Sequence, residues 1–305
     1  MSKHPEQPAP DLTASAIFNV RGFNAVVTGG SSGIGLMIAQ ALVANGAHVS
    51  ITGRSQEKLQ AAAERYSGGG AGAGTITPIV ADVTSKDSIK DLVAQVSKAC
   101  PDGLQLLVNN AGVARDTTAL QSFDGDENDA VQLAQFFFEQ GEPQAWADTF
   151  ATNATAHFFV SWAFVPLLAK GRERTGAGSI VNISSDSGLS KQSSGGLFAY
   201  ATSKAAANHL TKMLAVQLAP TKIRVNAIAP GLFPSEMTTG KSGSDQKADP
   251  FDLGENYDAR PARRPGRETD IGAAVLYLAS AGGEYVNGHI LAADGGSLLT
   301  GPSVV

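Results

Sequence analysis

Short apolar runs alternate with longer stretches of helical periodicity along most of this chain of 305 residues. Strands that alternate with crossover helices build a parallel sheet that is covered on both faces. The alternation therefore predicts an α/β protein with one parallel sheet of about seven strands. We expect the strands at Asn24–Thr28, His48–Thr52, Ile76–Val80, Leu104–Val108, Ser179–Ile183, Ile223–Ile228 and His289–Ala292.

Helices are expected between these strands. The segment Gly33–Ala44 is followed by an Asn-Gly pair, which is a common helix stop. In Phe198–Ala219, apolar residues recur with helical spacing on one stripe. Because no repeat or linker interrupts the pattern, residues 21–300 are expected to form one domain after a polar extension of residues 1–20. The remaining helices are expected at Ser55–Tyr66, Ser85–Ala99, Gln144–Ala169 and Asp270–Ala279.

Two segments depart from this rhythm. From Asp116 to Asp148 there are eight acidic residues and no Lys or Arg, and we interpret the region near 115–148 as a solvated surface insertion. Residues 241–267 are polar and rich in Pro and Gly, without clear periodicity. They follow a strand end, where ligands of such sheets bind. We therefore expect a mobile substrate lid near residues 236–267.

Composition and charge exclude several classes of function. The net charge of −5 leaves no basic footprint for nucleic acid. Cys100 is the only cysteine, so neither an internal disulfide nor a multi-cysteine metal site is possible, and no metal is expected. The polar start lacks the apolar core of a signal peptide, and no apolar run approaches the ~20 residues that span a bilayer. We therefore expect a cytoplasmic protein that binds neither nucleic acid nor membranes.

Tyr200 and Lys204 place a phenol and an ammonium one helical turn apart. Residues at i and i+4 share a helix face, with Cβ atoms roughly 5–6 Å apart. A free tyrosine has a pKa of about 10, and a nearby positive charge lowers that pKa by favouring the phenolate. A tyrosine adjusted in this way serves as a general acid or base. Since the chain has five tyrosines, the pair alone could arise by chance and needs partners elsewhere.

A glycine-rich turn, Thr28–Gly35, lies between the first expected strand and the first expected helix. Glycines let the backbone approach a pyrophosphate, and the helix N-terminus supplies free N–H groups and a partial positive charge. The spacing Gly-x-x-x-Gly-x-Gly differs from the more common Gly-x-Gly-x-x-Gly, but its position between strand and helix favours a dinucleotide site over an ordinary turn. The residues expected at the phosphates are Gly29, Ser31, Ser32, Gly33, Ile34 and Gly35.

The end of the second expected strand indicates which dinucleotide binds. An NAD-type site places an acidic residue about 20 positions after the glycines, where it holds the ribose 2′-hydroxyl. Here Arg54 and Ser55 occupy that place, and no Asp or Glu occurs between Gly35 and Glu57. A guanidinium attracts the 2′-phosphate of NADP(H), whereas a carboxylate repels it. We therefore expect NADP(H) rather than NAD(H), the alternative being that Arg54 is an ordinary surface residue.

With further motifs, the chain resembles a short-chain dehydrogenase/reductase over nearly everything from Arg21 to Gly296. The motifs stand in the family's order at suitable separations, and together they are far more specific than any one alone. The resemblance implies a Rossmann-type, doubly wound parallel sheet with helices on both faces. The motifs are Thr28–Gly35, Asp82-Val83, Asn109-Asn110-Ala111-Gly112, Asn153, Ser185, Tyr200 with Lys204, Pro230-Gly231 and Asp294-Gly295-Gly296.

The resemblance also implies a role for each site residue. Tyr200 would donate a proton to a carbonyl oxygen, and Lys204 would lower the pKa of Tyr200 and hydrogen-bond the nicotinamide ribose. Ser185, rather than Ser184 or Ser187, would hold the substrate oxygen. Asn153 would hold a water that links Lys204 to solvent, or would only satisfy backbone groups. The further cofactor contacts that the resemblance implies are Asp82, Val83, Asn109, Ala111, Gly112, Pro230, Gly231, Phe233 and Ser235.

The activity implied by the resemblance is NADP(H)-dependent interconversion of a ketone and a secondary alcohol. Two alternatives keep the fold: non-redox lyase or isomerase chemistry, and a non-catalytic NADP(H)-binding regulatory protein. The family and the aromatic-rich segment Phe150–Leu168 favour a homodimer or homotetramer. Apolar residues near the site favour a small-molecule substrate that is partly apolar; they are Leu189, Leu197, Phe198, Leu232 and Phe233.

Overall fold

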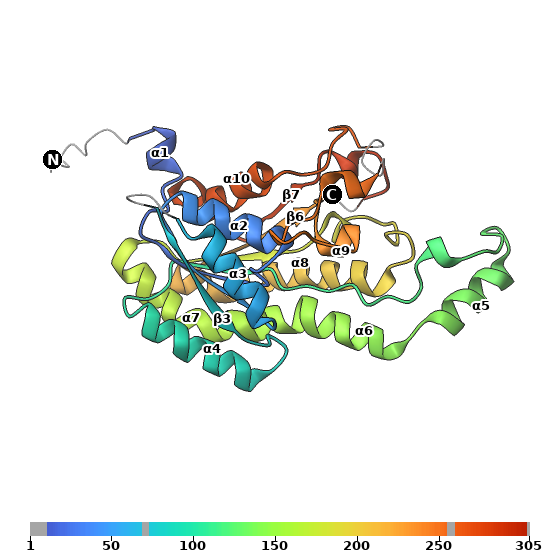
Figure 1. Cartoon of the computed structure of the whole chain (residues 1–305), viewed down its shortest axis with the longest axis horizontal. Helices are drawn as coiled ribbons and strands as arrows, with labels where there is room; N and C mark the ends of the chain where they lie inside the picture. The colour runs from blue at the N-terminus through green and yellow to red at the C-terminus, as the bar shows by residue number, and fades with distance from the viewer. Residues whose placement is uncertain (1–10, 69–72, 255–259, 304–305) are drawn as a thin grey trace, which may run out of the picture.

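A parallel sheet runs through the centre of the protein (Figure 1). The computed structural model describes residues 11–68, 73–254 and 260–303. Within these residues the sheet has seven strands in the order β3-β2-β1-β4-β5-β6-β7, and the expected doubly wound α/β fold is confirmed. The strands are β1 (Asn24–Thr28), β2 (His48–Gly53), β3 (Thr75–Val80), β4 (Leu106–Asn109), β5 (Ser179–Ile183), β6 (Arg224–Pro230) and β7 (Ile290–Ala293).

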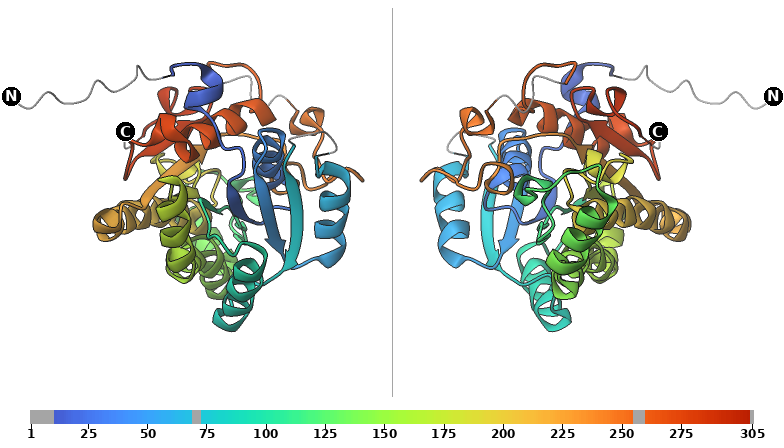
Figure 2. Two further views of the ribbon diagram at one scale, coloured as in Figure 1. Left: turned by 90° about the vertical axis from the view of Figure 1, so that its left-hand side faces the viewer. Right: turned by 90° about the vertical axis from the view of Figure 1, so that its right-hand side faces the viewer.

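Helices cover both faces of the sheet, which lies between them in the two views of Figure 2. One face is packed by α2 (Gly33–Ala44), α3 (Gln56–Tyr66) and α10 (Glu268–Ala279). The other face is packed by α4 (Lys86–Ala99), α7 (Ala156–Thr175) and α8 (Phe198–Leu218). Among the described residues, we find no helix with the length and apolar character needed to cross a membrane.

The core follows from the two-residue period of the strands. Ala25 and Val27 of β1 lie in the cluster under α2 and α10, whereas Val26 lies in the cluster under α7 and α8. Successive side chains of a strand point to opposite faces, so a strand that is covered on both sides must be apolar throughout. This requirement explains why the central strands β1 and β4 read as largely apolar runs, whereas the edge strand β3 alternates between exposed and buried residues.

The strand order places a binding crevice beside β1. The chain runs from β1 outwards to β2 and β3, then crosses back so that β4 pairs with the other side of β1. In open α/β sheets, ligands bind in the crevice at the carboxyl ends of the strands where the order reverses. The loops that follow β1, β2 and β4 therefore meet at one end of the sheet.

The helical region expected at about Gln144–Ala169 is present and extends from Pro143 to Thr175. That region consists of α6 (Pro143–Phe150), a π-helical turn at Ala151–Thr155, and α7. The acidic segment also contains α5 (Ala130–Gln140), which extends away from the sheet (Figure 1). A helix forms there because Asp129 caps its first turn, accepting hydrogen bonds from two backbone N–H groups.

The region expected as a lid contains little regular structure. It includes the short helix α9 (Glu236–Thr239) and a 3-10 turn at Pro250–Leu253, while residues 255–259 lie outside the described residues. In the expected N-terminal extension, α1 (Ala14–Ile17) is a short helix, and residues 1–10 lie outside the described residues.

Candidate active site

A cleft of about 600 Å³ opens at the carboxyl ends of the strands around β1. Loops after β1, β2, β3, β4 and β5 contribute to it, together with the starts of α8 and α9. Most of the residues expected to bind a cofactor line this single cleft. They are Gly29, Ser31, Ser32, Gly33, Ile34, Gly35, Arg54, Ser55, Asp82, Val83, Ala111, Gly112, Tyr200, Lys204 and Ser235.

The glycine turn is shaped for a close backbone approach. Gly29 and Gly33 have φ values of +63° and +52°, a conformation that favours glycine. A Cβ at Gly35 would lie 2.2 Å from the Gly29 carbonyl oxygen, so no larger residue fits there. The first turn of α2 has N–H groups without acceptors inside the helix, at its positive end. The residues present therefore fit the pyrophosphate of a dinucleotide.

Asn110 holds the glycine turn in place, and sequence reasoning did not single it out. Its side-chain amide donates to the Thr28 and Gly29 carbonyl oxygens, at 2.8 and 3.0 Å. The Thr28 hydroxyl in turn accepts hydrogen bonds from the backbone N–H groups of Asn110 and Ala111. The loop after β4 is thereby fixed to the loop after β1.

Two basic side chains lie near the end of β2. Arg54 and Lys58 both line the cleft, and Lys58 Nζ forms an ion pair of 2.9 Å with Glu236 of α9. Nearby, Asp82 accepts hydrogen bonds from the Thr84 hydroxyl and backbone N–H. These bonds, with a smaller contribution from the Arg54 charge, hold the pKa of Asp82 below its usual value.

Tyr200 and Lys204 lie on one face of α8, with Lys204 Nζ 5.7 Å from the centre of the tyrosine ring. Nζ donates a hydrogen bond of 3.0 Å to the Ile183 carbonyl oxygen, and burial lowers the pKa of Lys204 to about 8. Burial raises the pKa of Tyr200; the Asp186 charge adds to this rise, and a hydrogen bond with Ser185 opposes it. The expected lowering of the Tyr200 pKa by Lys204 is not found.

Of the adjacent serines, Ser184 lines the cleft and Ser185 does not. The Ser184 hydroxyl donates to the Lys204 carbonyl oxygen at 3.1 Å and is committed to holding α8. The Ser185 hydroxyl accepts from the Ser187 N–H at 3.1 Å and meets an Asp186 carboxylate oxygen at 3.2 Å. The Ser185 side chain also opposes the rise that burial causes in the Tyr200 pKa, which indicates that the two side chains lie near each other.

Asn153 is buried in the π-helical turn and does not line the cleft. Its side chain exchanges two hydrogen bonds of 2.8 Å with the Val113 backbone and donates to the Ser203 hydroxyl at 3.0 Å. The side chain thus satisfies backbone groups at Val113 and the Ser203 hydroxyl, and its expected role in holding a water linked to Lys204 stays a prediction. Sequence reasoning also missed His157, whose pKa is lowered to about 3 by burial and by the Lys204 charge, so its imidazole is neutral.

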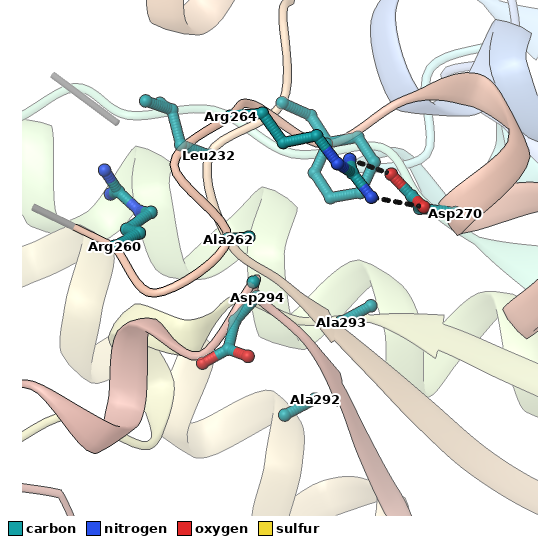
Figure 3. Close-up of a pocket in the computed structure, with 11 residues that line it drawn as sticks. Leu232, Arg260, Ala262, Arg264, Asp270, Ala292, Ala293 and Asp294 are labelled. Carbon is teal, nitrogen blue, oxygen red and sulfur yellow. Dashed lines mark hydrogen bonds and ion pairs between the residues drawn. The ribbon is translucent and has the colours of Figure 1, made fainter. Parts of the chain in front are cut away.

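Four of the expected cofactor residues lie outside the cleft lining: Asn109, Pro230, Gly231 and Phe233. The Asn109 side chain is buried and donates to polar side chains of α7 and β5. Phe233 is only 2% exposed, and a Cβ at Gly266 would overlap its ring. Phe233 instead lines a second cavity of about 230 Å³, where Arg264 and Asp270 form a two-bonded ion pair (Figure 3).

Comparison with known proteins identifies the family. The family model described as short chain dehydrogenase matches residues 24–246. The chain belongs to the short-chain dehydrogenase/reductase family. A member named short-chain dehydrogenase/reductase VdtF, from Byssochlamys spectabilis, is 38% identical over 96% of this chain and 98% of its own length. The galactitol 2-dehydrogenase (L-tagatose-forming) of Cereibacter sphaeroides is 34% identical over 92% of this chain and 96% of its own.

Solved structures of short-chain dehydrogenase/reductases match the whole fold. The NADP active-site complex of RhlG from Pseudomonas aeruginosa has a TM-score of 0.75 and 32% identity, over 92% of this chain and 98% of that one. A putative NAD(P)-dependent gluconate 5-dehydrogenase from Beutenbergia cavernae, with bound NADP, has a TM-score of 0.74 and 29% identity, over 93% and 100% of the two chains. The chain is thus a member of an oxidoreductase family that acts on small molecules.

Proposed function

We propose that this short-chain dehydrogenase/reductase interconverts a ketone and a secondary alcohol, with NADP(H) as the cofactor. Tyr200 and Lys204 line the same cleft as the glycine turn, and this shared position is the observation on which the proposal rests. Bound NADPH would supply the hydride. The chain would supply the position of the carbonyl group and the proton that its oxygen needs.

Tyr200 and Ser185 would act on the carbonyl oxygen. With its pKa above the ordinary value, the Tyr200 phenol is protonated at neutral pH, and it would donate that proton to the carbonyl oxygen during reduction. The Ser185 hydroxyl would donate a second hydrogen bond to the same oxygen as negative charge develops there. Lys204, protonated below its pKa of about 8, would stabilise the phenolate that remains.

The preference for NADP(H) over NAD(H) rests on the residues after β2. Arg54 lines the cleft at the place where an NAD-type site has a carboxylate, and Lys58 lies one helical turn further on. Two similar structures carry NADP in their descriptions. A substrate that is partly apolar remains part of the proposal, since Phe198, next to the catalytic pair, is 41% exposed.

A Tyr200→Phe variant tests the proposal. NADPH consumption at the nicotinamide absorbance band would be followed with a panel of apolar and polar ketones. We expect the variant to lose about 10²–10⁴-fold in kcat, with the Kd for NADPH unchanged. Tyr285→Phe, at a fully exposed tyrosine, is the matched control.

Each outcome separates the alternatives. Parent-like turnover by Tyr200→Phe would contradict the proposal. Product formation without NADPH consumption would favour lyase or isomerase chemistry, and tight NADPH binding without turnover of any carbonyl compound would favour a regulatory protein.

A further inference from the structure

The helix that carries Tyr200 and Lys204 is capped from a distant part of the chain. A helix begins with four N–H groups that have no acceptor inside the helix. In α8, the N–H of Phe198 bonds to the Gly196 carbonyl oxygen nearby in sequence. Leu197, at the N-cap position, has no side-chain oxygen with which to accept from the next two N–H groups.

Asp116 supplies the missing acceptors. Its Oδ1 accepts from the Ala199 N–H at 2.7 Å, and its Oδ2 accepts from the Tyr200 N–H at 3.1 Å. Both carboxylate oxygens are therefore used, one of them on the backbone of the catalytic tyrosine itself. A carboxylate at a helix N-terminus is also favoured by the positive end of the helix dipole.

The residues after Asp116 hold the loop that leads into α8. The Thr118 hydroxyl donates to the Gly196 carbonyl oxygen at 2.8 Å, and the Leu120 N–H donates to the Gly195 carbonyl oxygen at 2.8 Å. A Cβ at Gly196 would lie 2.2 Å from the Thr118 carbonyl oxygen, so the two segments are in close contact. We call residues 116–120 the brace.

Helix α5, which follows the brace, also reaches the start of α8. The rings of Phe137 and Phe198 meet edge-to-face, with centroids 5.3 Å apart. Phe198 is the first residue of α8, and aromatic pairs of this geometry are stabilising beyond their buried area. The acidic segment therefore contacts both the backbone and a side chain of the first turn of α8.

We propose that Asp116 is a positioning residue for the reaction: through the first turn of α8 it sets the position of the Tyr200 hydroxyl relative to Ser185. The inference rests on the proposed function, since Tyr200 is there the proton donor. A displacement of about 1 Å at a reacting group can cost about 100-fold in rate. If the first turn of α8 lost these hydrogen bonds, Tyr200 would be free to move by this distance, while the glycine turn would keep its structure.

Two variants and one control test the inference. Asp116→Ala removes both acceptors, whereas Asp116→Asn keeps one. The control is Asp124→Asn, an exposed carboxylate of the same acidic segment. We expect kcat to fall about 10- to 100-fold in Asp116→Ala and less in Asp116→Asn, with the Kd for NADPH unchanged. Hydrogen exchange of the Ala199 and Tyr200 amides should become faster in the same order, and the control should match the parent in every measurement.

Two results would overturn the inference. The first is a folded Asp116→Ala enzyme whose kcat stays within about twofold of the parent, even if its melting temperature falls, because only a structural cap is then lost. The second is unchanged exchange at Ala199 and Tyr200. The exchange measurement needs no substrate, so a parent without carbonyl turnover would contradict the proposed function and still leave Asp116 tested.

Discussion

Lys204 is a buried charge whose cost to the folded state depends on pH. Its side chain is 3% exposed, and burial lowers its pKa from 10.5 to about 8. Between these two values the unfolded chain binds more protons than the folded one, so the free energy of unfolding rises with pH there. The folded state bears the full cost below about pH 8, and the cost disappears above the pKa of the unfolded chain.

A Lys204→Met variant should therefore be less active than the parent and more stable. At pH 7 we expect its free energy of unfolding to exceed that of the parent by about 1–2 kcal/mol, after allowing for the lost hydrogen bond to Ile183. The gain should shrink by about 1 kcal/mol at pH 9, where the parent lysine is largely neutral. Urea unfolding at both pH values measures this difference, with the exposed Lys212→Met as control. An equal gain at both pH values would exclude charge burial as its cause.

Arg54 is expected to decide the cofactor. A charge-assisted hydrogen bond contributes about 1.5–3 kcal/mol, so Arg54→Ala should weaken NADPH binding about 10- to 100-fold. NADH lacks the 2′-phosphate, and its Kd should change little. Fluorescence titration of both cofactors provides the measurement, with the exposed Arg65→Ala as control. Equal losses for NADPH and NADH would mean that Arg54 does not contact the phosphate.

At the scale of elements, the junction of β1 and α2 depends on Gly35. A Cβ there would lie 2.2 Å from the Gly29 carbonyl oxygen and 2.4 Å from the Asn110 amide nitrogen. Both neighbours belong to the hydrogen bonds that hold the dinucleotide turn, and neither can move alone. Gly35→Ala should therefore abolish measurable NADPH binding and also lower the melting temperature.

Gly176→Ala is the matched control for that prediction. Gly176 ends α7 with φ +77° and has open space around its Cα, so alanine there strains the backbone without a clash. We expect it to cost about 1 kcal/mol of stability and to leave the Kd for NADPH unchanged. Calorimetry of both variants, with NADPH titration, separates loss of stability from loss of the site. NADPH binding by Gly35→Ala at parent affinity would refute the close-contact account.

The sequence predicted the strands well because their signal is local. The central strands β1 and β4 are almost wholly buried and read as largely apolar runs, whereas the edge strand β3 alternates between exposed and buried residues. The long helical region around Gln144–Ala169 was also predicted, but the π-helical turn within it was not. A π-helical turn at Ala151–Thr155 keeps the composition of a helix and shows only as a shift in the hydrogen-bond ladder.

The residues of the glycine turn could be predicted because a motif fixes their backbone. Residues whose side chains must point into the cleft were harder to predict. Neighbouring residues at a strand end point in opposite directions. Of the adjacent pair Asn109 and Asn110, only Asn110 lines the cleft. The resemblance implied a lowered Tyr200 pKa because spacing reports the nearby lysine, but spacing does not report the burial that raises this pKa. Asp116 lay in a segment expected to be solvated surface, and only the fold brings it to α8.

At the scale of the whole molecule, helices α6 and α7 leave aromatic side chains exposed. Trp146 stacks on Phe150 one turn later, and Phe158 meets Trp162 edge-to-face. Trp146 and Phe158 are each 41% exposed. Exposed apolar groups that gather in this way mark interaction surfaces more often than ordinary solvated faces. A second copy of the chain, presenting the same helices, would cover them with like surfaces.

Phe158→Glu tests this association. A carboxylate placed within an apolar contact is desolvated without a partner, so the assembly should dissociate. Sedimentation velocity at micromolar concentration should give a dimer or tetramer for the parent and a shift to monomer for the variant. Phe251→Glu replaces a phenylalanine that is 88% exposed outside α6 and α7, and it should sediment like the parent. A parent that sediments only as a monomer would show that the aromatic side chains of α6 and α7 face solvent, and that the site on α8 is complete within one chain.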